Sequence, residues 1–190
     1  MRDEPIADGI PEGNATVVSS EEGNRAGCGM TMRVERKLQE LGLVLPAAPR
    51  VPPGVKIPFA WVRVHRDRAY LSGHGPITPD GTPAGPFGRV GAEVSAAQAY
   101  TAARLATLSM LSGLRLSLGD LDRITAWLVV SGMVNVAPGF TETTNVINGC
   151  SDLLLEAFGS DVGAHARTAI GMAQLPLNLP VIVAAEVAIR

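Results

Sequence analysis

The hydrophobic positions of this chain follow a helical period in three stretches. In residues 95–116, alanine and leucine return every three or four positions, and Ser95 stands where a helix N-cap is expected. A second helical pattern covers residues 141–158, and a short amphipathic one begins at Arg33 and ends at a glycine, Gly42. The pattern therefore predicts two long helices and one short helix.

Extended, β-branched stretches lie between and after these helices. Residues 59–65 and 69–73 flank a polar turn and predict a hairpin, and residues 124–134 predict a strong strand. Two more strands, one around Arg167 and one from residue 181, close the chain. Because each long helix has one apolar stripe to cover, this order favours an α/β (α+β) domain whose mixed sheet carries both long helices on one face.

The strand predicted at residues 124–134 is too apolar to have a solvent-exposed face over its whole length. Helices on one face of the sheet leave the other face bare. We therefore expect a cover for the second face, and the simplest cover is another copy of the protein.

The composition is that of an ordinary soluble globular protein, with 46% hydrophobic and 18% charged residues. A formal net charge of −2 gives no electrostatic attraction to nucleic acid or to an anionic membrane, and we expect neither as a partner. The two cysteines, Cys28 and Cys150, form no metal-binding spacing, and we expect no metal or other cofactor. Unpaired thiols, no signal-peptide pattern and no membrane-length apolar run favour a cytoplasmic protein.

Residues 1–30 differ from the rest of the chain. They hold six acidic residues against two arginines, and they contain no leucine or aromatic residue. We expect a disordered acidic extension here and a single folded domain at residues 31–190. Met30 and Met32 precede the first helical pattern, so we expect translation to start at one of them; an extension with a regulatory role is the alternative.

One cationic residue, Arg167, lies among the apolar residues near the carboxyl end. A buried guanidinium without a partner costs several kcal/mol, so Arg167 needs a protein carboxylate or an anionic ligand. The only acid within ten residues of it is Asp161. Spacing alone leaves two roles open: a structural arginine, or one that holds an anionic ligand.

Three motifs occur in a fixed order along residues 33–190. They are Tyr-Leu-Ser-Gly-His-Gly-Pro at residues 70–76, the helical stretch at residues 146–159, and Ala-Arg-Thr-Ala at residues 166–169 before a Leu-Pro pair. Together they resemble a divergent subgroup of the Rid/YjgF family, the RidA-like reactive-intermediate imine deaminases. The resemblance implies a chorismate-mutase-like fold and a homotrimer whose sites lie in the clefts between subunits.

The resemblance also implies roles for single residues. Arg167 matches the arginine that holds the substrate carboxylate, and its parallel N–H donors suit that planar anion. Ser72 and Gly73 match the strand-end pair at the pocket wall, and we take Ser72 with Arg167 as the catalytic candidates. Ala169 stands where the family commonly has a cysteine whose backbone touches the ligand.

Two positions depart from the deaminase-active members that the chain resembles. Phe59 replaces a tyrosine, and Ile182 replaces a glutamate that would position the attacking water. Neither apolar side chain can move a proton, and Glu186 lies roughly 13 Å further along the strand. His74 is a candidate base with an ordinary pKa near 6.5, with a structural histidine as the alternative. We expect Phe59, Gly73, His74, Ala169 and Ile182 to contact the substrate.

Two functions follow from the resemblance. The first is hydrolytic deamination of reactive enamine or imine intermediates to 2-keto acids, in a weak or specialised form, with Arg167 anchoring the substrate carboxylate. The second is a non-catalytic trimeric binding protein for small carboxylate metabolites, which suits the apolar Phe59 and Ile182. An endoribonuclease ranks last, because no basic patch with interleaved aromatic residues occurs.

Overall fold

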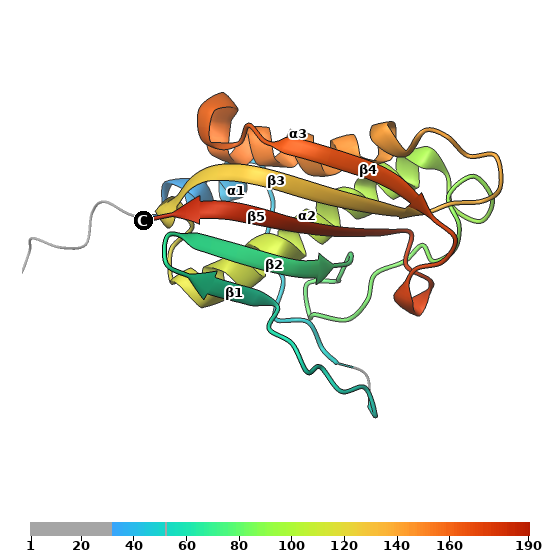
Figure 1. Cartoon of the computed structure of the whole chain (residues 1–190), viewed down its shortest axis with the longest axis horizontal. Helices are drawn as coiled ribbons and strands as arrows, with labels where there is room; N and C mark the ends of the chain where they lie inside the picture. The colour runs from blue at the N-terminus through green and yellow to red at the C-terminus, as the bar shows by residue number, and fades with distance from the viewer. Residues whose placement is uncertain (1–31, 52) are drawn as a thin grey trace, which may run out of the picture. The chain divides into compact units, whose positions relative to one another are not determined.

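A five-stranded sheet with helices on one face forms the fold (Figure 1). The computed structural model describes residues 32–51 and 53–190. The expected acidic extension at residues 1–30, which contains Cys28 and the candidate translation start Met30, lies outside the described residues. The helices are α1 (Arg33–Glu40), α2 (Ala96–Leu118) and α3 (Thr143–Val162), and the strands are β1 (Val62–His65), β2 (Arg68–His74), β3 (Ile124–Asn135), β4 (Ala166–Met172) and β5 (Val181–Ile189). Two short 3-10 turns are η1 (Leu121–Arg123) and η2 (Pro176–Asn178).

The strands lie in the order β1-β2-β5-β3-β4. β1, β2, β5 and β3 pair antiparallel, whereas β3 and β4 pair parallel, so the sheet is mixed. β4 and β5 follow each other in the chain but are separated in the sheet by β3. The hairpin β1-β2 and the strand β4 are therefore at opposite edges of the sheet.

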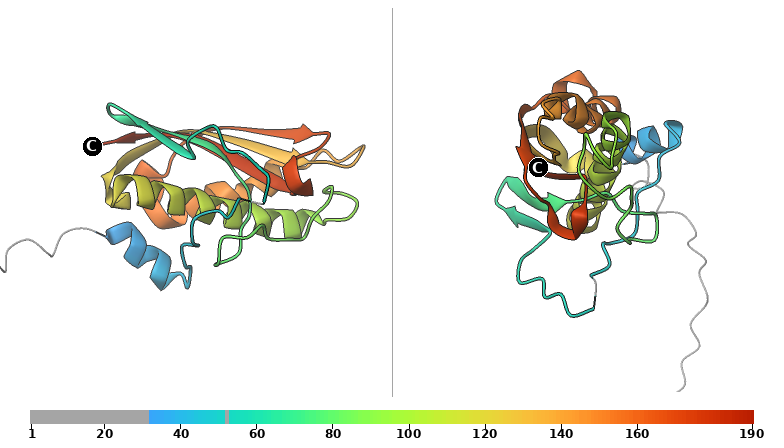
Figure 2. Two further views of the ribbon diagram at one scale, coloured as in Figure 1. Left: turned by 90° about the horizontal axis from the view of Figure 1, so that it is seen from below. Right: turned by 90° about the vertical axis from the view of Figure 1, so that its right-hand side faces the viewer.

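The two long helices cover one face of the sheet, as Figure 2 shows in its left view. α2 begins with a capping box in which Ser95 and Gln98 satisfy each other's backbone N–H groups. α2 packs against β5 and β2, whereas α3 packs against β3 and β4. A representative set of fully buried residues in this layer is Leu111, Leu114, Val130, Ile147, Leu154, Val183 and Val187. The predicted mixed sheet with two helices on one face is confirmed.

Two boundaries differ from the sequence prediction by three or more residues. The first strand begins at Val62 rather than at residue 59, because the preceding segment lies outside the sheet. α3 extends to Val162 rather than to residue 158, and it changes direction at Gly159, whose φ of 81° is a left-handed value that glycine adopts readily.

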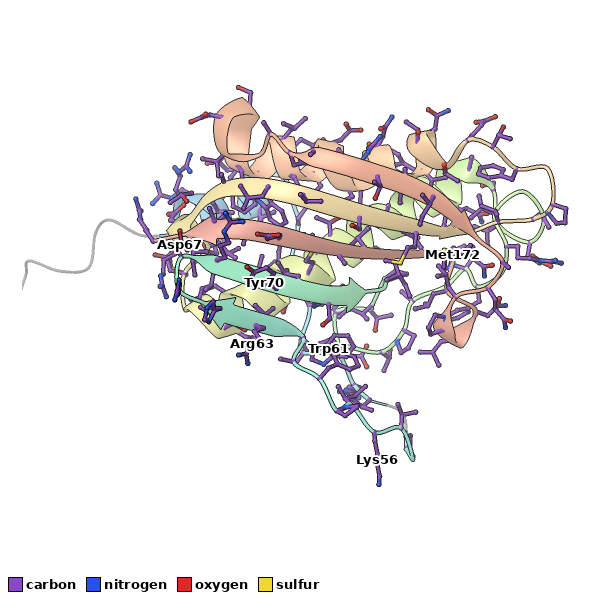
Figure 3. The ribbon with its side chains drawn as sticks, viewed as in Figure 1. Lys56, Trp61, Arg63, Asp67, Tyr70 and Met172 are labelled. Carbon is purple, nitrogen blue, oxygen red and sulfur yellow. The ribbon has the colours of Figure 1, made fainter. Side chains whose placement is uncertain are left out.

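No helix of the described residues covers the other face of the sheet. In the register of β4, β3 and β5, Ile170, Met133 and Ile182 form one cross-strand row on this face. Ile170 is 52% exposed, so its apolar surface is left without a cover within the chain. We call this surface the open sheet face; Figure 3 views the sheet from this side, with Tyr70 on β2.

No helix in the described ranges is long and apolar enough to span a membrane.

Candidate functional site

A cavity of about 500 Å³ lies at the carboxyl end of β2. Its wall comes from four parts of the chain: the segment of residues 49–59 before β1, the end of β2 with the loop after it, one turn of α2, and η2 with the start of β5. The residues used below are Arg50, Lys56, Phe59, Trp61, Gly73, His74, Ser109 and Ile182. We call this space the β2-end cavity, and we call the described residues 49–51 and 53–59 the connector.

Four of the seven predicted site residues meet in this cavity: Phe59, Gly73, His74 and Ile182. Ile182 lies on the open sheet face opposite Met133, whereas His74 is buried on the helix side, so the cavity passes around the end of β2. β2 and β5 lose their regular register between Leu71 and His74, which opens the space.

Position 73 needs a glycine because Ile182 of β5 packs closely against it. A Cβ at residue 73 would lie 2.8 Å from Cγ2 of Ile182, closer than two carbon atoms pack. A larger residue at position 73 would therefore push Ile182 aside and narrow the cavity.

Three rings form one wall of the β2-end cavity. Phe59 meets Trp61 edge to face with ring centroids 5.3 Å apart, and Trp61 lies over His74 at 5.4 Å. Figure 3 shows Trp61 where the connector enters β1, with Lys56 further out on the connector. Such a wall suits a flat or apolar ligand body.

The ring of His74 lies at the inner end of this cavity, and one of its nitrogens has no hydrogen-bond partner. Its Nδ1 lies 2.6 Å from the carbonyl oxygen of Ser72, and a carbonyl only accepts, so Nδ1 carries the proton and donates. Burial lowers the pKa of His74, although the Ser72 hydrogen bond opposes that shift. The neutral ring therefore presents a bare Nε2, which is buried and has no hydrogen-bond partner.

Ser109 on α2 is the second unsatisfied polar group of the β2-end cavity. The residue is completely buried, and its hydroxyl has no hydrogen-bond partner in the described part of the chain. A Cβ at Gly113, one turn further along α2, would lie 3.2 Å from Nε2 of His74. The two unsatisfied groups thus lie along neighbouring turns of the same helix.

Ser72 is outside the cavity wall, and its hydrogen bonds hold the wall in place. Its hydroxyl donates to the carbonyl of Ala60 at 2.8 Å, and its backbone N–H donates to the carbonyl of Trp61 at 3.0 Å. Both acceptors belong to the segment that carries the aromatic wall. A catalytic role for Ser72 stays a prediction.

Arg167 lies on β4, at the edge of the sheet away from β2. It is opposite Val130, which is fully buried under the helices, so its side chain is on the helix side. Its Nη1 donates to Oδ1 of Asn148 and to Oγ of Ser151, each at 2.9 Å. No carboxylate lies within salt-bridge distance of Arg167 among the described residues.

A hydrogen-bond chain fixes the acceptors of Arg167. His165 donates from Nδ1 to the carbonyl of Gly163 at 2.7 Å, so its Nε2 accepts from the hydroxyl of Ser151 at 2.9 Å. The oxygen of Ser151 is then oriented to accept from Arg167. His165 lies just before the first residue of β4, and Ser151 is the partner that it shares with Arg167.

Ala169 follows Arg167 on the same side of β4 and pairs with Gly132 of β3. Its carbonyl accepts a hydrogen bond from the hydroxyl of Thr143 at 3.0 Å. Neither Ala169 nor Arg167 lines the β2-end cavity of its own chain.

None of the described residues that line the β2-end cavity is acidic. Glu186 is engaged elsewhere: it forms an ion pair with Arg68 across β5 and β2. No group of three or more His, Cys, Asp or Glu side chains suited to a metal ion occurs in residues 32–51 and 53–190. Chemistry in this cavity therefore depends on neutral groups and on cations.

Sequence reasoning missed Trp61 and Ser109. Trp61 had a usable signal, because it is two residues after Phe59 and extended residues two apart share a face. Ser109 had none, because a serine within an apolar helix stripe looks like an ordinary core position. Asn148 lies within the helix predicted at residues 141–158, and its bond to Arg167 depends on how α3 packs on β4.

Comparison with known proteins identifies the family. The family model described as "YjgF/chorismate mutase-like, putative endoribonuclease" matches residues 85–187. Protein TCP17 of Trypanosoma cruzi is 38% identical over 150 residues, which cover 78% of this chain and 89% of TCP17. The chain belongs to the YjgF/RidA family.

Solved structures agree with the YjgF/RidA fold. Atu1372 of Agrobacterium tumefaciens, a protein of unknown function, is 34% identical with a TM-score of 0.72 over 82% of this chain and 91% of its own. TdcF of E. coli, crystallised with bound serine, is 16% identical with a TM-score of 0.51 over 75% of this chain and 93% of its own. The TdcF match shows the fold alone.

The matched region of the YjgF/RidA model contains Arg167, Ala169 and Ile182. Phe59 and the strand-end residues 72–74 lie before it. The family match therefore covers β4 and most of β5, while the aromatic wall of the β2-end cavity lies outside the matched region.

Proposed function

We propose that this YjgF/RidA family member hydrolyses a reactive enamine or imine derived from an amino acid to the 2-keto acid. The observation that carries the proposal is the state of Arg167. Its guanidinium is held by the neutral oxygens of Asn148 and Ser151 and has no carboxylate partner among the described residues. A half-buried cation held in this way is ready to bind the carboxylate of a ligand.

The proposed reaction needs little acid or base catalysis from the protein. An imine and water give a carbonyl compound and ammonia: water adds to the carbon of the C=N bond, protons move to nitrogen, and ammonia leaves as the C=O bond forms. Such imines hydrolyse readily in solution, so holding the carboxylate and one water in place supplies the acceleration. This fits a site without an acidic side chain.

The site is completed by a second copy of the chain. Arg167 and the β2-end cavity are at opposite edges of the sheet, so one subunit does not bring them together. The open sheet face offers the surface for assembly, and the family resemblance implies a homotrimer. In this arrangement Arg167 of one subunit faces the cavity of its neighbour.

The carboxylate-binding part of the proposal is supported by a distant likeness. TdcF, which has the same fold, was crystallised with serine, a small amino acid that carries a carboxylate. A small amino-acid-derived ligand is therefore of the right class for a cavity of about 500 Å³.

A binding protein without catalysis is the second candidate. It is favoured by Phe59 and Ile182 in the cavity wall, where an ionisable side chain would be needed to move a proton. The two candidates share the carboxylate contact of Arg167 and differ in turnover.

The test is ammonia release from 2-iminopropanoate generated in solution, measured with wild-type protein, Arg167→Ala and Arg167→Lys. We expect faster release with wild type than without protein, and a loss of about tenfold or more in Arg167→Ala, because a charge-assisted bidentate contact is removed. Arg36→Ala, which changes an exposed arginine of α1, is the matched control.

Calorimetry with pyruvate and 2-ketobutyrate separates the candidates. Binding that depends on Arg167 without any ammonia release would support the binding protein. Both candidate functions would be contradicted if ammonia release were equally fast with and without wild-type protein and if binding of the keto acids did not depend on Arg167.

A further inference from the structure

The β2-end cavity holds two polar atoms that nothing in the described part of the chain satisfies. Nε2 of His74 and Oγ of Ser109 are both buried without a hydrogen-bond partner, and the two residues are 1% and 0% exposed. A buried polar atom without a partner is costly, and native proteins rarely keep two in one place unless something binds there. Both residues line the cavity, so its occupant is the natural partner.

The chemistry of these two atoms selects one kind of group. Nε2 of His74 only accepts, because its Nδ1 donates to the carbonyl of Ser72. Oγ of Ser109 can donate and accept. A hydroxyl group fits both, because it donates to Nε2 while it accepts from Ser109.

A carboxylate does not fit this inner end of the cavity. It has no proton to give to Nε2, and burial of His74 disfavours the imidazolium that would attract a negative charge. The cations at the cavity lie elsewhere, on the connector: Arg50 is 3.6 Å from Asp80, and Lys56 has no carboxylate within salt-bridge distance among the described residues. A carboxylate therefore belongs at the outer end, where the proposed function adds Arg167 of the neighbouring subunit.

The space between the two ends suits an apolar, flat group. Phe59, Trp61 and Ile182 form its wall, and the rings of Phe59 and Trp61 already meet edge to face. An aromatic ring of the ligand can join this cluster at a distance typical of aromatic pairs.

We propose that the inner end of the β2-end cavity is a specificity subsite for a hydroxyl group, and that the ligand is a carboxylic acid with an aromatic body and a hydroxyl remote from the carboxylate. His74 accepts from the hydroxyl, Ser109 donates to it, and the aromatic wall holds the ring. The inference rests on the proposed function in that both place the ligand in this cavity with its carboxylate at Arg167 of the neighbouring subunit. It names the ligand class that the cavity selects.

The test is a matched pair of acids that differ by one hydroxyl: para-hydroxyphenylpropanoate and phenylpropanoate, titrated into the full chain by calorimetry. We expect the hydroxylated acid to bind about tenfold more tightly, because it satisfies two buried groups that the other acid leaves without partners. The preference should fall to about threefold in Ser109→Ala and in His74→Phe, because each variant removes one of the two partners and leaves the other.

Two controls fix the interpretation. Thr101→Ala, on the exposed side of α2, should keep the full preference. Arg167→Ala should weaken the binding of both acids to the same extent and leave the ratio of their affinities unchanged. If the proposed function is wrong, Arg167→Ala changes neither affinity, and the ratio of affinities still reports on the subsite.

Equal affinity for the two acids in wild type would overturn the inference, as would failure of both to bind. A preference that stays at its full wild-type value in both Ser109→Ala and His74→Phe would also overturn it. Should His74→Phe fail to fold, Ser109→Ala alone decides, since it removes one oxygen and leaves the ring cluster intact.

Discussion

Gly149 of α3 lies directly against the carbonyl oxygen of Tyr100 of α2, so that a Cβ at residue 149 would overlap that oxygen. The two long helices touch here through their backbones. The same two helices are also joined by the hydroxyl of Tyr100, which donates to Asp152 at 2.8 Å. This contact sets the distance between α2 and α3 and therefore the packing of the helix layer beneath the sheet.

Gly149→Ala should therefore destabilise the fold. Overpacking costs up to about 3 kcal/mol, and the better helix propensity of alanine returns only about 1 kcal/mol, so we expect a net loss of about 2 kcal/mol. Urea unfolding followed by circular dichroism measures it. Thr144→Ala on the exposed side of α3 is the control and should be neutral or slightly stabilising; an equally stable Gly149→Ala would mean that the helices separate without cost.

His74 should make stability fall as the solution becomes more acidic. Burial lowers its pKa below the ordinary value near 6.5, so in mildly acidic solution the unfolded chain binds a proton that the folded chain does not. The stabilisation is complete above about pH 6.5 and is lost as the pH falls toward the folded-state pKa, by at most about 1.4 kcal/mol per pH unit. Thermal unfolding of wild type and His74→Gln at several pH values checks this, and parallel curves would contradict it.

Ile170→Lys should break the assembly that the proposed function requires. Ile170 is 52% exposed on the open sheet face, and a lysine there places a charge in the proposed subunit contact. Light scattering during gel filtration should show smaller particles than for wild type. Leu155→Lys is the matched control, because Leu155 is 41% exposed on α3, outside the sheet. An unchanged mass for Ile170→Lys would exclude this face as the contact.

Cys150 should be chemically protected in the folded protein. It is fully buried, and burial raises the pKa of its thiol to about 11. At pH 8 only about one thiol in a thousand is then ionised, so in a Cys28→Ser variant we expect labelling by a disulfide reagent at least about 100-fold slower than in urea. Rapid labelling of the folded variant would show that the α2–α3 layer opens readily.

The helices were predictable because their signals are local. Ser95 and its partner Gln98 are three residues apart, and the apolar stripe of α2 needs no knowledge of the rest of the chain. The end of α3 was predicted at residue 158 because Gly159 interrupts the pattern, yet one more turn follows it. β1 was predicted too early because Phe59 and Trp61 alternate as strand residues do, although the segment before Val62 lines a cavity instead.

The site was predictable in part. Motif resemblance indicated Phe59, Gly73, His74 and Ile182, and these do meet in one cavity. The neutral partners of Arg167 were not predictable, because they depend on the packing of α3 against β4. Neither was the role of Ser109, since only the folded structure shows that its hydroxyl lacks a partner.

The connector before β1 supplies a wall of the β2-end cavity without belonging to any helix or strand. Insertions, deletions or exchanges in residues 49–59 can therefore alter which molecules the cavity admits while the sheet and the α2–α3 layer keep their packing. A library of variants confined to this segment would change ligand specificity while the residues that stabilise the fold stay the same. A site built wholly from strands does not offer this separation.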